Sequence, residues 1–479
     1  MELENWGGIL ARARVQSPGL KQLSRKGFEK EKRLFSSPGL RKSLQLVGFL
    51  VLASVAAGSM WLYVQRVLVP YETADAIAHQ RPRGNLSDLY PRWLGARELL
   101  IDHRNPYGND VTAEIQQGYY GRELDSKRPN DPIDQQGFAY PVYVVFVLAP
   151  LVAFPFHAAQ IAFYWLLLGL TAASVWLWLR ALPWRLPVLS IAPSIILTLG
   201  SFSAVQGIKL QQLSLLVAAL MAGAAAFVAG DNLFSAGALL ALATIKPQLA
   251  WPLVAWLFLW SVSDWRRRRR FVFGFGAVMV LLLAGAEIVL PGWWGTFIEA
   301  LRQYHRYTRN ESVLDQLLPW AFAGKVAAGV ALLASGVLLW RSRVEPAASV
   351  RFGRTTALVL ALTVLVVPMY APYNQVLLLP AILTLVRDRK IFFSRARGVR
   401  FLYLAGVFAL AWQWIASAAL VGMYLFGSEA WALERWWLPF FATFATPLII
   451  FALTFLLVSW RLVASEVEPG AASAARGRG

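Results

Sequence analysis

Long apolar runs alternate with short charged loops along most of this 479-residue chain. Many runs reach the roughly 20 residues that a helix needs to cross the hydrocarbon core of a bilayer. The pattern predicts about twelve spans with both termini on the cytoplasmic side, so the expected fold class is an all-α polytopic membrane protein. The predicted spans are 44–69, 138–156, 158–182, 188–205, 213–230, 233–260, 271–290, 320–340, 355–369, 373–386, 401–426 and 439–460.

The stretch between residues 138 and 262 allows two interpretations. Lys246 and Pro247 interrupt the apolar run 233–260. If that run forms two short helices, the run 138–182 must cross the membrane only once. Otherwise the later Arg-rich loops would no longer all lie on the cytoplasmic side. The apolar pattern alone does not decide between these alternatives.

Composition and charge agree with a membrane protein. The chain is 57% hydrophobic and 15% charged, whereas soluble domains are roughly 45–50% apolar and about 25% charged. The net charge of +19 comes mainly from the tail 1–43 and from short loops, above all the run Arg266–Arg270. The positive-inside rule places such segments in the cytoplasm. Membrane lipids, rather than nucleic acid, are therefore the expected partners of this charge.

The same pattern predicts the domain organisation. We expect a basic cytoplasmic tail over 1–43, a single transmembrane domain over 44–462 and a disordered cytoplasmic tail over 463–479. Polar loops at 70–138 and 291–319 fall on the non-cytoplasmic side. The chain has no cysteine and four histidines, which excludes disulfides, thiolate chemistry and Cys-ligated metals and argues against a His-based metal site.

Asp88 in the first polar loop is the foremost candidate for chemistry. Apolar spacing predicts a helix over Ser87–Ile101 that lies along the membrane interface with its apolar face down. Ser87 or Asp88 would then occupy the N-cap, which Asp fills well. The alternative is a general base, because a carboxylate near an interface is easily desolvated. Position alone favours the cap. The apolar face consists of Leu89, Trp93, Ala96 and Leu100.

The second polar loop carries a basic stripe. Arg302, His305, Arg306 and Arg309 recur at spacings that place them on one face of a helix. Arginine side chains match the oxygens of a phosphate, so the stripe is a candidate phosphate site. Contact with lipid headgroups explains it equally well.

Several polar residues interrupt the apolar runs. Lys246 would line a cavity or meet a partner, because a cation within the membrane costs roughly 2.5–3.5 kcal/mol; a lysine that snorkels from the end of a short helix is the alternative. Gln211 and Gln212 are adjacent polar residues between two apolar runs. Tyr373 and Asn374 could bind a sugar, although aromatic residues at an interface need no further function.

Four segments, taken in order, resemble glycosyltransferase family 87. They read D-L-Y-P-R-W-L-G-A-R-E-L-L-I-D-H-R-N-P-Y (88–107), F-A-Y-P-V-Y…A-P-L…P-F (138–156), K-L-Q-Q-L-S-L-L (209–216) and S-A-G-A-L-L-A-L-A-T-I-K-P-Q (235–248). The resemblance extends over about residues 45–390. The chain departs from the family pattern at Val142, where a second proline is usual, and at 209–212.

The resemblance implies a GT-C-type bundle in a bacterial inner or plasma membrane with its active site on the non-cytoplasmic face. It implies an inverting transfer of mannose or arabinofuranose from a polyprenyl-phosphate donor to a lipid or polysaccharide acceptor, with Asp88 as the catalytic base. No cofactor is expected, and a divalent metal requirement stays open. The donor phosphate would meet Lys246, Arg302, His305 and Arg306, and the substrates would contact Tyr90, Arg97, Tyr107, Tyr140, Gln211, Tyr373 and Asn374.

Two other functions compete with this one. A transporter or flippase of lipid-linked sugars would show internal repeats and ionisable groups near the membrane midplane; no clear repeat is present, and Lys246 is the one fair midplane candidate. A non-catalytic scaffold would tolerate loss of Asp88 and of the basic stripe.

Overall fold

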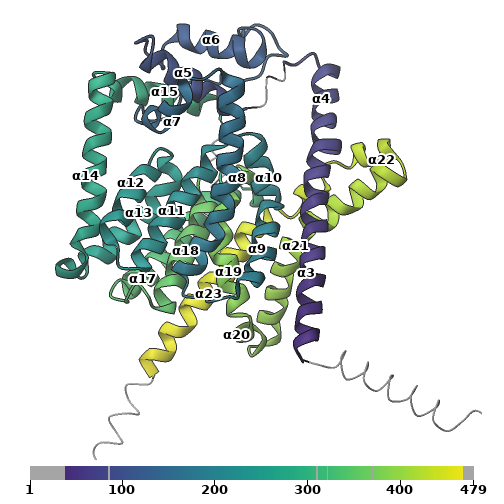
Figure 1. The fold of residues 1–479 in the computed structure, drawn as a ribbon, viewed down its shortest axis with the longest axis vertical. Coiled ribbons are helices and arrows are strands. Elements are labelled where there is room, and N and C mark those ends of the chain that lie inside the picture. The colour runs from purple at the N-terminus through teal and green to yellow at the C-terminus, as the bar shows by residue number, and fades with distance from the viewer. Residues whose placement is uncertain are drawn as a thin grey trace, which may run out of the picture. The chain divides into compact units, whose positions relative to one another are not determined.

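The computed structural model describes residues 38–82, 84, 87–308, 311–320, 322–368 and 370–467. Every regular element in these ranges is helical, and none is a strand. The chain divides into two units between Ser54 and Val55. Among the described residues, the smaller unit contains only the first part of α3, and the larger unit carries all other elements (Figure 1). The predicted tails and Arg309 lie wholly or largely outside the described residues.

The helices follow the apolar runs closely. The first half contains α3 (Pro38–Tyr63), η1 (Val64–Leu68), α4 (Val69–Ala78), α5 (Tyr90–Leu100), α6 (Asn109–Tyr120), α7 (Val144–Val152), α8 (Phe156–Ala181), α9 (Val188–Leu199), α10 (Phe202–Lys209), α11 (Leu213–Ala229) and α12 (Leu233–Ala243). The second half contains α13 (Pro247–Val262), α14 (Trp265–Val289), α15 (Trp293–Tyr307), α16 (Val313–Leu317), α17 (Ala323–Ser342), α18 (Val350–Val366), η2 (Pro372–Leu378), α19 (Leu379–Arg387), α20 (Arg389–Phe393), α21 (Arg397–Phe426), α22 (Glu429–Glu434), η3 (Leu438–Phe440) and α23 (Ala445–Val467).

The number of helices long enough to cross a membrane is smaller than the predicted count. Six described segments pass a test of length and composition, or seven if α9 and α10, bent by 61°, count as one span. An all-helical, multi-pass membrane protein is therefore confirmed, whereas the count of about twelve is not reached. The remaining apolar helices α11, α12 and α13 have only 11 to 17 residues. The six segments are Ser43–Ala78, Phe156–Ala181, Trp265–Val289, Ala323–Ser342, Arg397–Phe426 and Glu429–Trp460.

The structure decides between the two interpretations of 138–262. The run 233–260 consists of two helices, α12 and α13, that are separated at Thr244–Lys246. Pro247 causes the break, because it has no N–H and disfavours helical geometry at the residue before it; Lys246 has φ −124° and ψ 77°. The run 138–182 contains one long helix, α8, since α7 has only nine residues. The expectation of a separate span over 138–156 was wrong.

Helices α12 and α14 pack at very short range through two glycines. A Cβ atom on Gly237 would lie 2.1 Å from the carbonyl oxygen of Phe271, and one on Gly274 would lie 2.1 Å from that of Phe234. Small residues let helix backbones approach in this way, which favours dispersion contacts inside a membrane protein. The contact fixes α12, and with it the break that carries Lys246.

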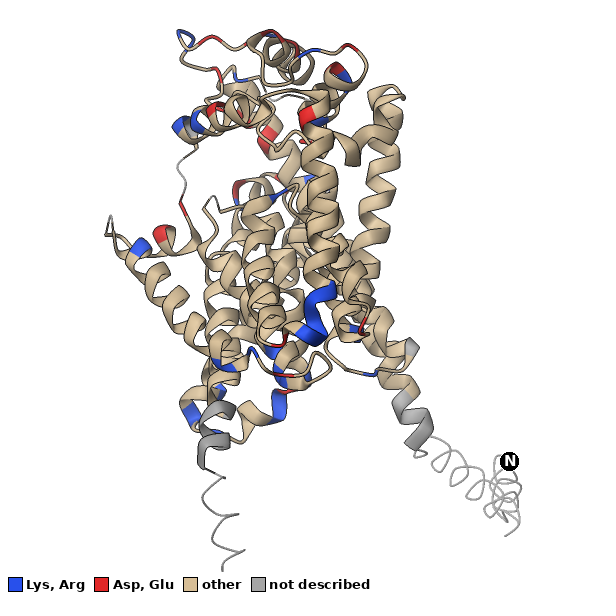
Figure 2. Cartoon of the chain, turned by 90° about the vertical axis from the view of Figure 1, so that its left-hand side faces the viewer, with Lys and Arg blue, Asp and Glu red and all other residues tan. Residues whose placement is uncertain are grey.

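The elements around the first polar loop gather at one end of the larger unit. Helices α5, α6, α7 and α15 lie together there, while the start of α14, which carries Arg266–Arg270, lies at the opposite end (Figure 1). Acidic residues concentrate toward the α5–α6 end, and Lys and Arg occur at both ends (Figure 2). The two predicted polar loops thus share one end of the helical unit.

Candidate active site

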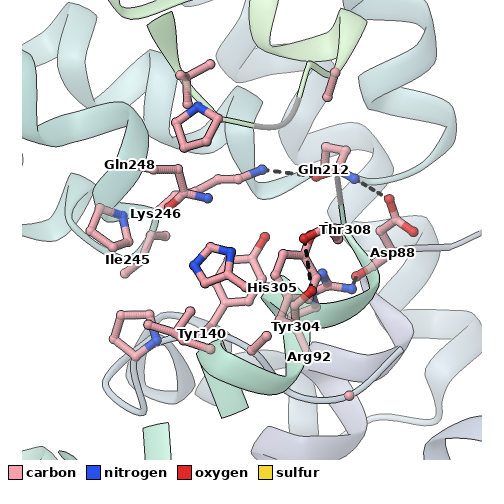
Figure 3. Close-up of a pocket in the computed structure, with 18 of the residues that line it drawn as sticks. Asp88, Arg92, Tyr140, Gln212, Ile245, Lys246, Gln248, Tyr304, His305 and Thr308 are labelled. Atoms are coloured by element: carbon pink, nitrogen blue, oxygen red, sulfur yellow. Dashed lines mark hydrogen bonds between the residues drawn. The ribbon is translucent and has the colours of Figure 1, made fainter. Parts of the chain in front are cut away.

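A cavity of about 390 Å³ lies where the first loop meets helix α15 and three later breaks between helices. Its size is typical of a small-molecule site. Most of its polar side chains come from breaks between helices. Backbone and side-chain groups at such a break are not engaged within a helix, so they can contact a ligand. Its lining includes Asp88, Arg92, Tyr140, Gln212, Lys246 and Tyr304 (Figure 3).

Asp88 does not cap helix α5. The helix begins at Tyr90, its N-cap is Leu89, and no side chain caps it, so the predicted cap was wrong. The carboxylate Oδ2 instead accepts a hydrogen bond from Nε2 of Gln212, and the backbone N–H of Asp88 donates to the carbonyl of Leu210 at 2.9 Å. The apolar face of α5 is covered by protein: Leu89, Trp93 and Ala96 are buried in the core. The apolar face of α5 therefore packs against the rest of the protein.

Gln211 holds the residue next to Asp88. The hydroxyl of Ser87 donates to Oε1 of Gln211, and Nε2 of Gln211 donates to the carbonyl of Gln160 at 2.7 Å. Gln211 has a φ of 56°, a left-handed conformation that residues other than glycine rarely adopt. Both ends of its amide are thus occupied by protein groups, and its side chain does not line the cavity. Gln211 fixes the Ser87–Asp88 segment against the α10–α11 turn.

Lys246 points into the cavity from the break between α12 and α13. It is 6% exposed, and its Nζ donates to Ser214 Oγ at 2.6 Å and to Gln212 Oε1 at 3.4 Å. Ser214 in turn donates to Asn374 Oδ1 at 2.8 Å, and the ammonium lies 5.1 Å from the centre of the Tyr373 ring. This geometry favours the cavity over the snorkelling alternative.

Arg92 is a second cation at the cavity that the sequence reasoning did not name. It lies one helical turn after Asp88, and its Nη1 donates to the carbonyl of Asp88 at 2.8 Å. Its guanidinium lies 4.9 Å from the centre of the Tyr140 ring. The Nε of Arg92 is buried without a hydrogen-bond partner. A buried donor without a partner is costly, so a ligand atom that accepts from it would bind favourably. The i, i+4 spacing from Asp88 was the available signal.

The charges in the cavity shift the pKa values of its acids. Burial raises the pKa of the Asp88 carboxyl; Arg92 and Lys246 oppose this shift, Asp134 reinforces it, and the net direction is upward. Burial would also raise the pKa of the Tyr140 phenol, but Lys246 and Arg92 outweigh burial and lower it. Asp88 thus sits where its neutral form is favoured more than in water, which suits a group that must accept a proton.

Helix α15 presents only part of the basic stripe to the cavity. The predicted helix is present, and Tyr304 and His305 line the cavity. The Arg302 side chain is 68% exposed and pairs with Glu299 at 3.4 Å, and Arg306 is exposed as well. Neither Arg302 nor Arg306 lines the cavity, because the stripe is wider than the face that α15 turns inward.

Three more predicted substrate ligands support the loop without reaching the cavity. The Tyr90 ring packs edge-on against Phe156 with centroids 4.8 Å apart. Arg97 donates to the carbonyl of Val152 at 2.9 Å, and the Tyr107 hydroxyl donates to the carbonyl of Tyr140 at 2.6 Å. Tyr107 therefore fixes the backbone of a residue that does line the cavity. Tyr373 and Asn374, by contrast, line it directly.

Metal ligands are not grouped at the cavity. Within the described ranges, no set of three His, Asp or Glu side chains is arranged to hold an ion. Asp134, the second carboxylate of the cavity, accepts instead from the backbone N and the side-chain Nε2 of Gln136, at 3.0 and 2.9 Å.

Comparison with known proteins identifies the family. Residues 138–368 match the family model of Glycosyltransferase family 87. Neither the search of curated proteins nor that of solved structures gives a match. The matched segment includes Tyr140, Gln212, Lys246 and Tyr304, whereas Asp88 precedes it. Residues 138–368 therefore form a glycosyltransferase family 87 domain, in a chain whose described residues include the long apolar helices of a multi-pass membrane protein.

Proposed function

We propose that this protein transfers a sugar from a polyprenyl-phosphate donor to a lipid or polysaccharide acceptor by a single, inverting displacement. One observation carries the proposal: a desolvated carboxylate, Asp88, and two cations, Lys246 and Arg92, line the same cavity of a membrane glycosyltransferase. A displacement at an anomeric carbon needs these two kinds of group, a base for the acceptor and positive charge for the leaving phosphate.

Asp88 is the proposed general base. Its carboxylate takes the proton of an acceptor hydroxyl as the hydroxyl oxygen bonds to the anomeric carbon. The bond from that carbon to the donor's phosphate oxygen breaks with its electron pair, and polyprenyl phosphate leaves with one more negative charge. The configuration at the anomeric carbon inverts because attack and departure occur on opposite faces.

Lys246 and Arg92 are the proposed ligands of the departing phosphate. The ammonium of Lys246 is bonded to Ser214, Gln212 and Tyr140, and its positive charge lies in the wall of the cavity. The buried Nε of Arg92 lacks a partner, and His305 adds a third group at the cavity wall. Tyr140, Tyr373 and Asn374 would contact the sugar. Arg302 and Arg306 are left out of this proposal because they lie outside the cavity.

The charge pattern supports a site on the non-cytoplasmic face. The positive-inside rule assigns the end of α14 that carries Arg266–Arg270 to the cytoplasm, and the first loop lies at the other end (Figure 1). Family resemblance favours a GT-C-type bundle over residues 44–462 in a bacterial inner or plasma membrane. It also favours mannose or arabinofuranose as the donor sugar.

Replacing Asp88 with Asn tests the proposal. Purified protein is offered radiolabelled polyprenyl-phosphate mannose or arabinofuranose with membrane acceptors, and products are analysed. D88N should lose roughly 10²- to 10⁴-fold in rate, the usual contribution of a positioned base. Its thermal unfolding in detergent should occur at or above the wild-type temperature, because the buried carboxylate is disfavoured when charged.

The exposed carboxylate of Asp110, which pairs with Arg104 on the outer side of the loop, provides the matched control. D110N should transfer at the wild-type rate. Wild-type transfer by D88N would refute the assignment of the base. Movement of the labelled donor across vesicles without any product would instead support a transporter.

A further inference from the structure

Asp88 and Lys246 carry opposite charges in one cavity and yet do not pair with each other. Both are described by the structure, and no ion pair joins them. Gln212 lies between them: its Nε2 donates to Asp88 Oδ2, and its Oε1 accepts from Lys246 Nζ at 3.4 Å (Figure 3). One neutral amide therefore receives the anion at its donor end and the cation at its acceptor end.

Direct contact between the two charges would impair both proposed roles. A lysine bonded to a carboxylate favours the ionised form of the acid and makes it a weaker base. The same contact would direct the ammonium away from the phosphate. A neutral amide weakens both effects: its bond also lowers the pKa of the Asp88 carboxyl, but a hydrogen bond from a neutral donor favours the carboxylate less than direct contact with an ammonium.

The backbone holds Gln212 firmly in this place. Gln212 is 3% exposed and is the N-cap residue of α11. Its N–H donates to the carbonyl of Gly207 at 2.8 Å, and its carbonyl accepts from Leu215 at 3.2 Å. The charged neighbours also fix which way the amide points, since the flipped amide would set NH₂ against the ammonium and oxygen against the carboxylate.

We propose that Gln212 is a positioning residue that separates the base from the cation. It holds Oδ2 of Asp88 so that the other carboxylate oxygen can accept the proton of the acceptor hydroxyl, and it keeps Lys246 available to the donor phosphate. This inference rests on the proposed function, because it assigns Gln212 a task only if Asp88 is the base.

Two replacements should move the pH profile in opposite directions. In Q212L the two charges can meet, so the acidic limb of kcat/KM should move to lower pH and the KM for the donor should rise. In Q212E a second carboxylate stands beside Asp88, so the limb should move to higher pH. Transfer at neutral pH should fall roughly 10- to 100-fold in Q212L, as for other small displacements of reacting groups. The charged and titratable groups around Asp88 are Arg92, Tyr119, Tyr120, Asp134, Tyr140, Lys246, Tyr304 and Tyr373, and all stay unchanged in both variants.

The experiment measures kcat and KM against pH for wild type, Q212L, Q212E, Q116L and D88N, with polyprenyl-phosphate sugar as the donor. Gln116 is the matched control, because it is buried and bonded at both ends of its amide but lies outside the cavity. Q116L should leave the limb at its wild-type position.

Each outcome decides a separate point. Opposite displacements of the limb support the role of Gln212. If D88N is inactive but the acidic limbs of Q212L and Q212E both coincide with the wild-type limb, Gln212 is only a packing residue and this inference is overturned. If D88N is active, the proposed function itself is wrong. Should Q212L fail to fold, as judged by gel filtration in detergent, the limb of Q212E decides alone.

Discussion

Replacing Lys246 with Met should separate activity from stability. The substitution removes the ammonium but keeps an unbranched side chain of similar length in the break between α12 and α13. Lys246 is proposed to stabilise the departing phosphate, so transfer should fall. The folded state gains little from a buried cation, so the melting temperature should hold or rise.

The magnitudes follow from the contacts of the ammonium. Its hydrogen bonds at 2.6 Å to Ser214 and 3.4 Å to Gln212 are each worth about 1.5–3 kcal/mol as bonds to a charged group. Burying the ion costs several kcal/mol, so the net change in unfolding free energy should lie within about 1–2 kcal/mol of zero. Loss of one preorganised donor to a developing oxyanion costs roughly 2.7–4 kcal/mol, or 10²- to 10³-fold in kcat.

The assay compares K246M with K209M in detergent or nanodiscs. Lys209 lies near the same turn, 5.7 Å from the centre of the Trp61 ring, and does not line the cavity. K209M should therefore transfer sugar like wild type. The reasoning is refuted if K246M keeps a kcat close to that of wild type, or if it loses activity only because it unfolds.

Three further changes test the surroundings of the site. Transfer should fall as pH falls, with a midpoint above the usual Asp value of about 3.9, because burial raises the pKa of Asp88 and protonation removes the base; a pH profile of kcat/KM locates the midpoint. Gly237→Val should lower the melting temperature, since a Cβ there meets the Phe271 carbonyl at 2.1 Å; light scattering during heating measures the change. Arg268→Lys should also lower the melting temperature, because the buried guanidinium donates to the Trp260 carbonyl at 2.7 Å and to the loop 343–345, and each carbonyl left unpaired costs roughly 1–3 kcal/mol.

The apolar pattern predicted where several helices lie, but it did not predict which helices are long enough to cross the membrane. The run predicted over 213–230 is α11, Leu213–Ala229, and the run 271–290 lies almost wholly within α14. Hydropathy does not distinguish a side chain buried in protein from one that faces lipid. Val144, Val145 and Leu148 on α7 are fully buried inside the protein, so their apolar run looked like a span although the helix is too short to cross.

The cavity was predicted in part, and the misses have a common physical reason. Lys246 was found because a charge within an apolar run is costly and calls for an explanation, and Asp88 because a carboxylate near a membrane interface is easily desolvated. Arg302 and Arg306 were misplaced because residues three to four apart share a helix face without any indication of which neighbour that face meets. Arg92 was overlooked because a basic residue in a polar loop is ordinary until its surroundings are known.

The two adjacent glutamines set the limit of what patterning can resolve. Gln211 was named as a substrate ligand and Gln212 was not, yet Gln212 lines the cavity and Gln211 does not. Gln211 has a left-handed φ of 56° in the α10–α11 turn. Within this turn the Gln211 amide bonds to Ser87 and the Gln212 amide to Asp88. Both positions are glutamine, so residue type cannot distinguish them. Only the backbone geometry of the α10–α11 turn places Gln211 against the first loop and Gln212 between Asp88 and Lys246.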